Sequence, residues 1–278
     1  MGDVMSFFPG ADFIKFGYYS PLDRIHRLML RWREKLDERL PASRLKDAIA
    51  YPSLKDVVAY TGLSAAEIRK RAMEKSTHKD AWFTHSRNSE ADYRAFYQED
   101  DWYIYWQPWK FRHYTWHFLT KMLPLGGSLV EYGCGVAAMT TWMSRWYPGY
   151  RYTVADIPSA TLQFAQFRLQ GRRNVEIKTI RMGREGLPLT GRYDLVVCTE
   201  VLEHTINPDE ICEHFCDHLA SGGLLYLNFQ NEGWGGENLE EARERRPATL
   251  KILRERLHAL KAIDEGGTNW GLYQARLE

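Results

Sequence analysis

Residues 128–137 read Ser128-Leu129-Val130-Glu131-Tyr132-Gly133-Cys134-Gly135-Val136-Ala137. This apolar run ends in an acidic residue and a Gly-x-Gly turn, and residues 138–147 follow with apolar side chains at helical spacing. Glycines after a strand let the backbone approach a ligand closely, with the N–H groups of the next helix nearby. The stretch is typical of a nucleotide-binding turn, although the dinucleotide fingerprint has a third glycine where Ala137 or Ala138 stands.

The composition is that of a globular protein with a full core. The chain has 278 residues, of which 44% are hydrophobic and 26% charged. Its net charge of +1 gives no electrostatic reason to expect nucleic acid or a membrane as a partner. Four cysteines are too few for a disulfide framework in a chain of this size. We expect a cytoplasmic protein, because residues 1–16 lack a signal-peptide pattern and no apolar run approaches the roughly 20 residues that span a bilayer.

The N-terminal part, residues 1–120, is expected to form a helical cap that binds the substrate. Residues 21–40 show apolar side chains at the spacing of an amphipathic helix. Ser53 and Ser64 each begin a capping-box pattern, and a turn at Gly62 separates the two helices that would follow. Two helices around a glycine turn also describe a DNA-reading module, but the second helix is only briefly basic, which favours a packing subdomain.

Aromatic side chains concentrate between residues 93 and 116. One interpretation is a helix-packing interface rich in rings. The other is a lid over a cationic ligand, since ring faces attract sulfonium or ammonium groups by roughly 0.5 to 2 kcal/mol each. Both can hold at once. The lid would include Tyr103, Trp106 and Trp109, together with Trp234 from the glycine-rich loop at 233–236.

From Leu125 onward, strand patterns alternate with helix patterns, which predicts an α/β fold with a doubly wound, mostly parallel seven-stranded sheet. The expected strands are 128–132, 151–155, 175–180, 193–198, 224–229, 259–263 and 271–276. In such sheets the ligand lies at the carboxyl ends of the strands, near the point where the strand order reverses. Asp156 ends the second strand, about 20 positions past the glycine turn, where an acid can accept both ribose hydroxyls.

Four segments in this order resemble the class I S-adenosylmethionine-dependent methyltransferases. They are Val130 to Gly135, Val154 to Ile157, Tyr193 to His204 and Leu219 to Leu224. The resemblance covers about residue 125 to the C-terminus, so that residues 121–278 would form a Rossmann-like catalytic domain. Residues 1–120 lie outside it, as the variable cap does in that superfamily.

The resemblance implies a role for each strand end in binding S-adenosylmethionine. The glycine turn would pass under the methionine part, with the acid before it holding the amino group. The acid after the second strand would take the ribose hydroxyls, with its neighbour against the adenine. The implied contacts are Glu131, Gly133, Cys134, Gly135, Asp156, Ile157 and Thr199. After the third strand the family often has an aspartate, whereas this chain has Arg181-Met182-Gly183, so a backbone contact at Met182 is expected.

The segment Glu200-Val201-Leu202-Glu203-His204 follows the fourth strand. If a helix starts at Thr199, its two carboxylates and its imidazole share one face toward the substrate. The resemblance then offers two roles for Glu200, Glu203 and His204. They could hold Mg²⁺, as in some relatives, although we favour a metal-free site. His204 could independently act as a general base, because its pKa is close to neutral pH.

The helix expected at 209–219 carries two cysteines and two histidines, which are residue types that bind zinc. Its periodicity places Cys212 and Cys216 on the apolar face, while His214 faces away from that face. These cysteines are therefore expected in the core.

Methyl transfer to an O or N atom of a small molecule is the expected reaction. It is an in-line displacement in which the protein orients the two reactants and excludes water. Two alternatives stay open. One is a cyclase that forms azetidine-2-carboxylate and methylthioadenosine from the cofactor. The other is a cofactor-binding protein without catalysis. Neither nucleic acid nor membrane is expected as a partner, and the aromatic cap could pair two subunits.

Overall fold

The structure of the chain is a computed structural model. It describes residues 53–74, 81, 83–85, 89–110, 123–181, 183–230, 238–265 and 268–277. Several expectations fall outside these residues, among them the helix at 21–40, the glycine-rich loop at 233–236, the aromatic residues after position 110 and the backbone contact at Met182.

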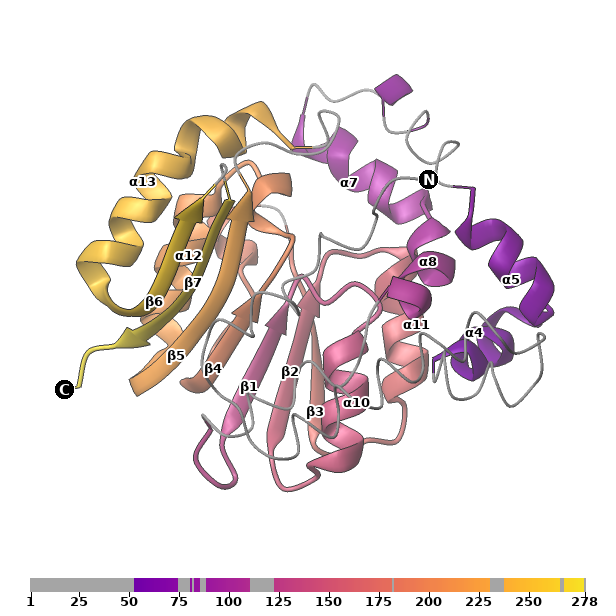
Figure 1. Cartoon of the computed structure of the whole chain (residues 1–278), viewed down its shortest axis with the longest axis horizontal. Coiled ribbons are helices and arrows are strands. Elements are labelled where there is room, and N and C mark those ends of the chain that lie inside the picture. Colours follow the sequence, from indigo (N-terminus) through magenta and orange to yellow (C-terminus); the bar gives the residue numbers. More distant parts are fainter. Residues whose placement is uncertain are drawn as a thin grey trace.

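A seven-stranded sheet organises the described part of the chain, in the order β3-β2-β1-β4-β5-β7-β6 (Figure 1). The strands are β1 (Ser128–Tyr132), β2 (Arg151–Asp156), β3 (Val175–Thr179), β4 (Tyr193–Cys198), β5 (Leu219–Gln230), β6 (Leu257–Glu265) and β7 (Thr268–Ala275). The first five strands pair in parallel, and β7 runs antiparallel to both β5 and β6. The doubly wound α/β fold is therefore confirmed. The strand order reverses between β1 and β4, which places the expected ligand edge there.

The start of β5 differs from the prediction. The sequence Ser221-Gly222-Gly223 suggested a helix end followed by a strand at Leu224, but the strand begins at Leu219. Gly222 adopts a φ of +69°, and the pairing of β5 with β4 shifts register beside it. A glycine in the left-handed region can make an irregularity inside a strand as readily as it ends a helix.

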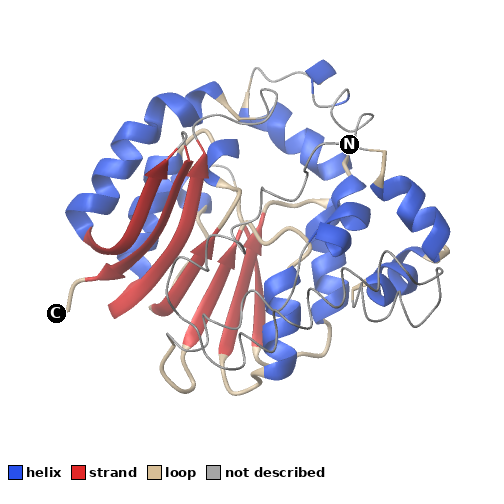
Figure 2. Ribbon diagram, viewed as in Figure 1, coloured by secondary structure: helices blue, strands red, loops and turns tan. Residues whose placement is uncertain are grey.

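Helices cover both faces of the sheet (Figure 2). On one face, α12 (Pro208–His218) and α13 (Glu240–Arg256) pack on Val130, Tyr132 and Val196. On the other face, α10 (Ala138–Trp146) and α11 (Ala160–Leu169) pack on side chains that include Leu129 and Val154. Alternate residues of each strand thus point to opposite cores, as expected for a sheet buried on both sides.

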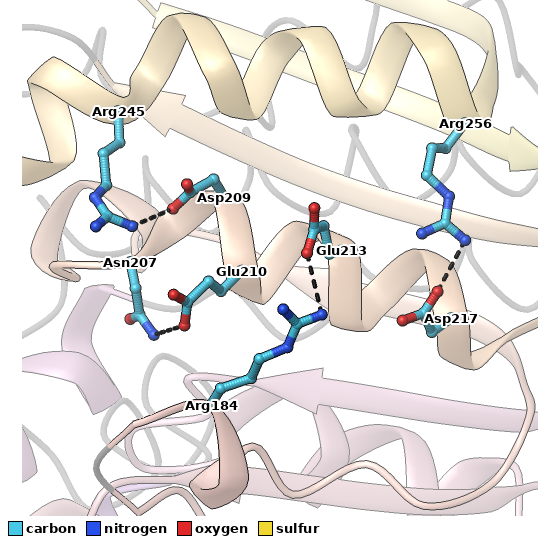
Figure 3. A network of polar contacts seen from close by, with 8 residues as sticks. All are labelled: Arg184, Asn207, Asp209, Glu210, Glu213, Asp217, Arg245 and Arg256. Carbon is cyan, nitrogen blue, oxygen red and sulfur yellow. Dashed lines mark hydrogen bonds and ion pairs between the residues drawn. The ribbon is translucent and has the colours of Figure 1, made fainter.

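Helix α12 shows the predicted division into an apolar and a polar face. Cys212 and Cys216 are buried in the core and form no disulfide. Acids on the opposite side bind arginines of neighbouring elements (Figure 3). The pairs are Asp209 with Arg245 at 2.9 Å, Asp217 with Arg256 at 2.8 Å and Glu213 with Arg184 at 3.3 Å. The core position of the cysteines is confirmed.

The two histidines of α12 form hydrogen bonds with backbone groups and do not belong to a set of metal ligands among the described residues. His214 Nε2 accepts a hydrogen bond from the Leu189 N–H at 3.0 Å, and His218 Nδ1 lies 2.6 Å from the Gly191 carbonyl oxygen. Burial lowers the pKa of His214 to about 4, so the ring is neutral and able to accept this bond.

Four helices precede the sheet in the described chain: α4 (Leu54–Thr61), α5 (Ala65–Ala72), α7 (Glu90–Glu99) and α8 (Trp102–Lys110). Helices α4, α7 and α8 contact α11, and α5 packs on α8 (Figure 1). Ser64 forms the predicted capping box with Glu67, but the Ser53 side chain does not cap α4. None of the described helices has the length and apolar composition needed to cross a bilayer.

Candidate active site at the strand ends

The Gly-x-Gly turn after β1 is fixed to the end of β2. The N–H groups of Gly133 and Cys134 both donate to the Ala155 carbonyl oxygen, at 2.8 and 3.1 Å. Gly133 and Gly135 adopt φ values of +67° and +50°. Glycine reaches this region without steric cost, so the turn brings bare backbone to the ligand edge of the sheet.

Asp156 closes β2 and braces the same turn. Its Oδ2 accepts a hydrogen bond from the Gly135 N–H at 2.5 Å, and its Oδ1 accepts one from the Ile157 N–H at 2.7 Å. Burial raises the pKa of Asp156 to about 6, against the opposing effect of these two amides. Each oxygen keeps a further lone pair, so the carboxylate can still accept hydroxyl groups of a ligand.

Glu131 is the last residue but one of β1 and binds the first turn of α10. Its Oε2 accepts a hydrogen bond from the Thr140 N–H at 2.9 Å, in the first turn of that helix. Burial raises the pKa of Glu131 to about 7. A second acid therefore lies at the strand ends with a pKa close to neutrality.

The segment after β4 packs directly on the glycine turn. A Cβ atom on Gly133 would lie 2.2 Å from Cγ2 of Val201, so only glycine fits at this contact. The predicted helix from Thr199 is wrong. Glu200 adopts a φ of +59°, and only Leu202–His204 forms a single 3₁₀ turn. Because the left-handed residue breaks the helical path, the two glutamates and the histidine do not share one helix face.

Side chains of β5 hold Glu200 in its left-handed conformation. Its N–H donates to Asn228 Oδ1 at 2.6 Å, and the Asn228 Nδ2 donates back to its carboxylate. Gln230 Nε2 donates to both carboxylate oxygens, at 2.9 and 2.8 Å. Asn228 is fully buried, whereas Glu200 is exposed. These amides thus hold the Glu200 carboxyl group at the open edge of the sheet.

Glu203 is the most unusual group at the site. Its side chain is 1% exposed, and among the described residues no side chain donates a hydrogen bond to either carboxylate oxygen. Burial and the charge of nearby Glu200 raise the pKa of Glu203 well above its usual range, against the smaller effect of the Glu203 and Val201 backbone amides. A buried carboxyl with so few donors costs free energy, which makes Glu203 a candidate functional group of the site.

Thr199 and His204 flank these glutamates and are both half-buried. The alternative metal set of Glu200, Glu203 and His204 is not assembled, because no three His, Cys, Asp or Glu side chains gather to hold an ion in the described ranges. The reason is local: Glu200 turns toward the amides of β5, while Glu203 points into the protein interior.

Helices α7 and α8 cover the ligand edge of the sheet. Gln107 of α8 lies on the glycine turn, where its Oε1 accepts the Val136 N–H at 3.3 Å. Arg94 of α7 donates to the carbonyl oxygens of Ile180 and Arg181, at 3.0 and 3.1 Å. Residue 182, the expected adenine contact, lies outside the described residues.

The predicted aromatic lid is partly described. Trp106 stacks on Trp102 with ring centroids 4.8 Å apart, and Tyr103 meets Trp102 edge-on at 5.2 Å. Tyr103 and Trp106 are half-buried. All three rings belong to α8, so these contacts lie within one helix and do not distinguish a helix-packing interface from a lid. The side chain of Trp109 and the whole of Trp234 lie outside the described residues.

Several polar residues of the site were not predicted. Asn228 and Gln230 had a detectable pattern, since polar residues two apart at the carboxyl end of an apolar strand share one face. No sequence pattern pointed to Gln107 or Arg94, because polar side chains on helices usually face solvent. The same holds for Arg168 of α11, which donates to the Val136 carbonyl oxygen in the glycine turn. Their importance depends on which elements pack together.

The strand ends together fit a nucleoside that carries a cationic amino acid. A glycine turn offers backbone contact, Asp156 offers acceptors for ribose hydroxyls, and Glu131 offers an acid for an ammonium group. In S-adenosylmethionine these three groups occur in one molecule, so the residues present fit that cofactor.

Comparison with known proteins agrees with this fit. The methyltransferase domain family matches residues 92–271, which is more than half of the chain. A ubiquinone biosynthesis O-methyltransferase of Xanthomonas axonopodis pv. citri is 26% identical over 112 residues, covering 40% of this chain and 46% of the relative. An uncharacterized protein of Synechococcus is 29% identical over 127 residues, covering 41% of this chain and 30% of the relative. The chain thus spans less than half the length of these curated relatives.

Among solved structures, the N-methyltransferase NodS of Bradyrhizobium japonicum, in complex with S-adenosylhomocysteine, is similar at a TM-score of 0.44. The identity is 16%, and the match covers 66% of this chain and 96% of NodS. The family match over most of the sheet and the strand order confirm the resemblance first noted in the sequence. The chain belongs to the class I S-adenosylmethionine-dependent methyltransferases.

Proposed function

We propose that this methyltransferase moves the methyl group of S-adenosylmethionine in line to an O or N atom of a small molecule. The observation that carries the proposal is the contact of Val201 with the glycine turn, which brings the segment of Glu203 and His204 beside the cofactor site. In this arrangement residues 1–120 form the substrate cap and residues 121–278 the cofactor domain.

The proposed cofactor contacts follow the strand ends. Asp156 accepts the ribose hydroxyls, and Glu131 binds the amino group directly or through water. Gly133 to Gly135 pass under the methionine part. Ile157 lies against the adenine, and Thr199 lines the methionine side. The braced amides of the turn and the carboxylate of Asp156 support this assignment.

The proposed acceptor contacts come from the segment after β4. The bound cofactor supplies an electrophilic methyl group, and the protein must remove the proton of the attacking O–H or N–H. His204 is the general base, and Glu203 in its ionised form accepts the proton that the imidazolium gives up, as the raised pKa of this carboxyl favours. Glu200 is fixed by amides at the exposed edge, where it accepts a hydrogen bond from the acceptor molecule.

Product analysis with a panel of small-molecule phenols, catechols and amines tests the proposal. We expect S-adenosylhomocysteine and a methylated acceptor by mass spectrometry, at a rate that a chelator leaves unchanged. Methylthioadenosine as the product would overturn methyl transfer in favour of cyclisation. Cofactor binding without turnover of any panel member would overturn the proposed small-molecule reaction.

The variant Glu203→Gln separates catalysis from packing. We expect kcat to fall about 100-fold, within the usual range for a lost acid–base group, with KM for the cofactor unchanged. The melting temperature should change little, because the amide has the shape of the carboxyl, and burial already favours the neutral form of Glu203. Glu213→Gln, on the surface of α12, is the control and should change neither quantity. A Glu203→Gln enzyme with wild-type kcat would exclude the assigned role.

Cofactor affinity should depend on pH through Glu131 and Asp156. Their pKa values of about 7 and about 6 lie above those of free carboxyl groups, so at pH 6 Glu131 is mostly protonated and Asp156 is about half protonated. Binding a cationic amino acid and ribose hydroxyls favours the ionised forms. We therefore expect the dissociation constant of S-adenosylmethionine to fall about tenfold between pH 6 and pH 7.5, measured by calorimetry.

The stability of the cofactor-free protein should change in the opposite direction. Because these folded pKa values are raised, each group contributes stability that is present at low pH and lost as pH rises through 6 to 7. For cofactor binding, a dissociation constant that stays the same between pH 6 and pH 7.5, while the protein remains folded, would contradict the cofactor contacts proposed for Glu131 and Asp156.

A further inference from the structure

The peptide groups of Val136, inside the cofactor turn, are held from both sides by helices. The Val136 N–H donates to Gln107 Oε1 of α8 at 3.3 Å. The Val136 carbonyl oxygen accepts a hydrogen bond from Arg168 Nη1 of α11 at 2.6 Å. Backbone groups of a ligand-binding turn are thus bound by side chains that the turn itself does not supply.

Arg168 connects this carbonyl to the start of α4. Its Nη2 donates to Ser53 Oγ at 2.7 Å, and its Nε lies 3.2 Å from Asp56 Oδ2. The Arg168 side chain is 1% exposed, whereas that of Asp56 is 25% exposed. A guanidinium at this depth depends on its partners, since a buried charge that loses its counter-ion is strongly unfavourable. The Ser53 hydroxyl, which does not cap α4, therefore accepts a hydrogen bond from Arg168.

The turn requires such external support because of its backbone. Val136 lies between Gly135, at a φ of +50°, and Ala137, at a φ of +49°. A residue with a Cβ in the left-handed region costs roughly 1 kcal/mol or more and persists only where its surroundings impose it. Ala137 is fully buried and stands where related nucleotide turns often have glycine.

We infer that α4 and α8 set the conformation of the cofactor turn through this Val136 clamp, defined as Ser53, Asp56, Gln107 and Arg168. These four are positioning residues. Their contribution is to hold residues 135–137 in the binding conformation before the cofactor arrives, which avoids an ordering cost on binding. By linkage, cofactor binding must in turn strengthen the docking of α4 on α11. The inference requires only that the chain binds S-adenosylmethionine, and it is independent of the acceptor.

The variant Asp56→Ala tests the clamp, because Asp56 reaches the turn only through Arg168. We expect the dissociation constants of S-adenosylmethionine and S-adenosylhomocysteine to rise about tenfold by calorimetry, as expected for an indirect positioning effect. Amide hydrogen exchange of residues 133–140 in the cofactor-free protein should become faster.

Asp209→Ala is the matched control. Asp209 also has 25% side-chain exposure and pairs with an arginine, Arg245, at 2.9 Å, but on the α12–α13 side of the sheet. Its cofactor affinity should remain that of wild type. If Asp56→Ala does not fold, Ser53→Ala removes one Arg168 partner without removing charge and should weaken binding about threefold.

A second substitution connects the effect to the strained turn. Ala137→Gly removes the cost of the left-handed backbone, so adding it to Asp56→Ala should recover at least about threefold in affinity. The clamp is refuted if folded Asp56→Ala binds cofactor like wild type, or if Asp209→Ala weakens binding equally. A double variant that binds no better than Asp56→Ala would likewise refute the role assigned to the turn.

Discussion

Asp156→Asn should weaken the binding of S-adenosylmethionine about 100-fold. The carboxylate accepts hydrogen bonds from the N–H groups of Gly135 and Ile157. An asparagine has one oxygen, so its NH₂ group must face one of these donors, and it also loses an acceptor for the ribose. Each lost bond to a charged group costs about 1.5 to 3 kcal/mol. Because a tenfold change in the dissociation constant corresponds to about 1.4 kcal/mol, two such losses account for a 100-fold weaker binding. Calorimetric titration of the purified variant measures the change.

Asp194→Asn is the control for Asp156→Asn. Asp194 accepts the Ser128 N–H at 2.7 Å at the opposite end of β1, far along the strand from the glycine turn. This variant should lower the melting temperature while leaving cofactor affinity within about twofold. Affinity within threefold of wild type for folded Asp156→Asn would contradict the proposed ribose contact and the bracing of the turn.

Gly133→Ala should abolish measurable cofactor binding and destabilise the fold by about 2 to 4 kcal/mol. Two costs add. The φ of +67° is unfavourable for alanine, and the new Cβ would lie 2.2 Å from Val201 Cγ2 and 2.9 Å from its Cγ1. To relieve the clash between the new Cβ and Val201, either the glycine turn or the segment after β4 must move. Both lie at the proposed cofactor site. Chemical denaturation and calorimetry measure the two effects.

A double-variant cycle with Val201→Ala separates these costs. Removing both Cγ atoms leaves Val201 Cβ at 3.1 Å, so the double variant should recover the steric part of the loss and keep the backbone part. Gly171→Ala is the control for the backbone part alone, since Gly171 has a φ of +78° and nothing within 4 Å of its Cβ position. If Gly133→Ala costs no more than Gly171→Ala, the contact with Val201 is not the constraint described above.

The sequence predicted the sheet closely because each parallel strand is buried on both faces. β1 and β4 were placed at their observed bounds, and β2 ends one residue later than expected, at Asp156 itself. Continuous apolar runs bounded by glycines and acids leave little choice of register. The start of β5 could not be read in this way, because the same glycines are compatible with a helix end or with a bulge.

The segment after β4 shows where local patterns fail. Glu200, Glu203 and His204 have the spacing of one helix face, yet Glu200 adopts a left-handed φ of +59°. The cause is the bonding of its N–H and carboxylate to Asn228 and Gln230 on β5, which lie 28 and 30 positions away in the chain. No local propensity contains that information.

The amino-acid sequence by itself determined the succession of strands along the chain, the glycine turn and the acids near the ends of β1 and β2, because these depend on hydrophobic pattern and on residues with special backbone freedom. Only the tertiary structure decided which charges become buried. Arg168 joins Asp56 to the Val136 carbonyl oxygen across 112 and 32 positions of sequence, and the Glu203 carboxyl is buried in the protein interior. The physical reason is that the environment of a charged side chain is set by the elements that pack around it, and those contacts are nonlocal.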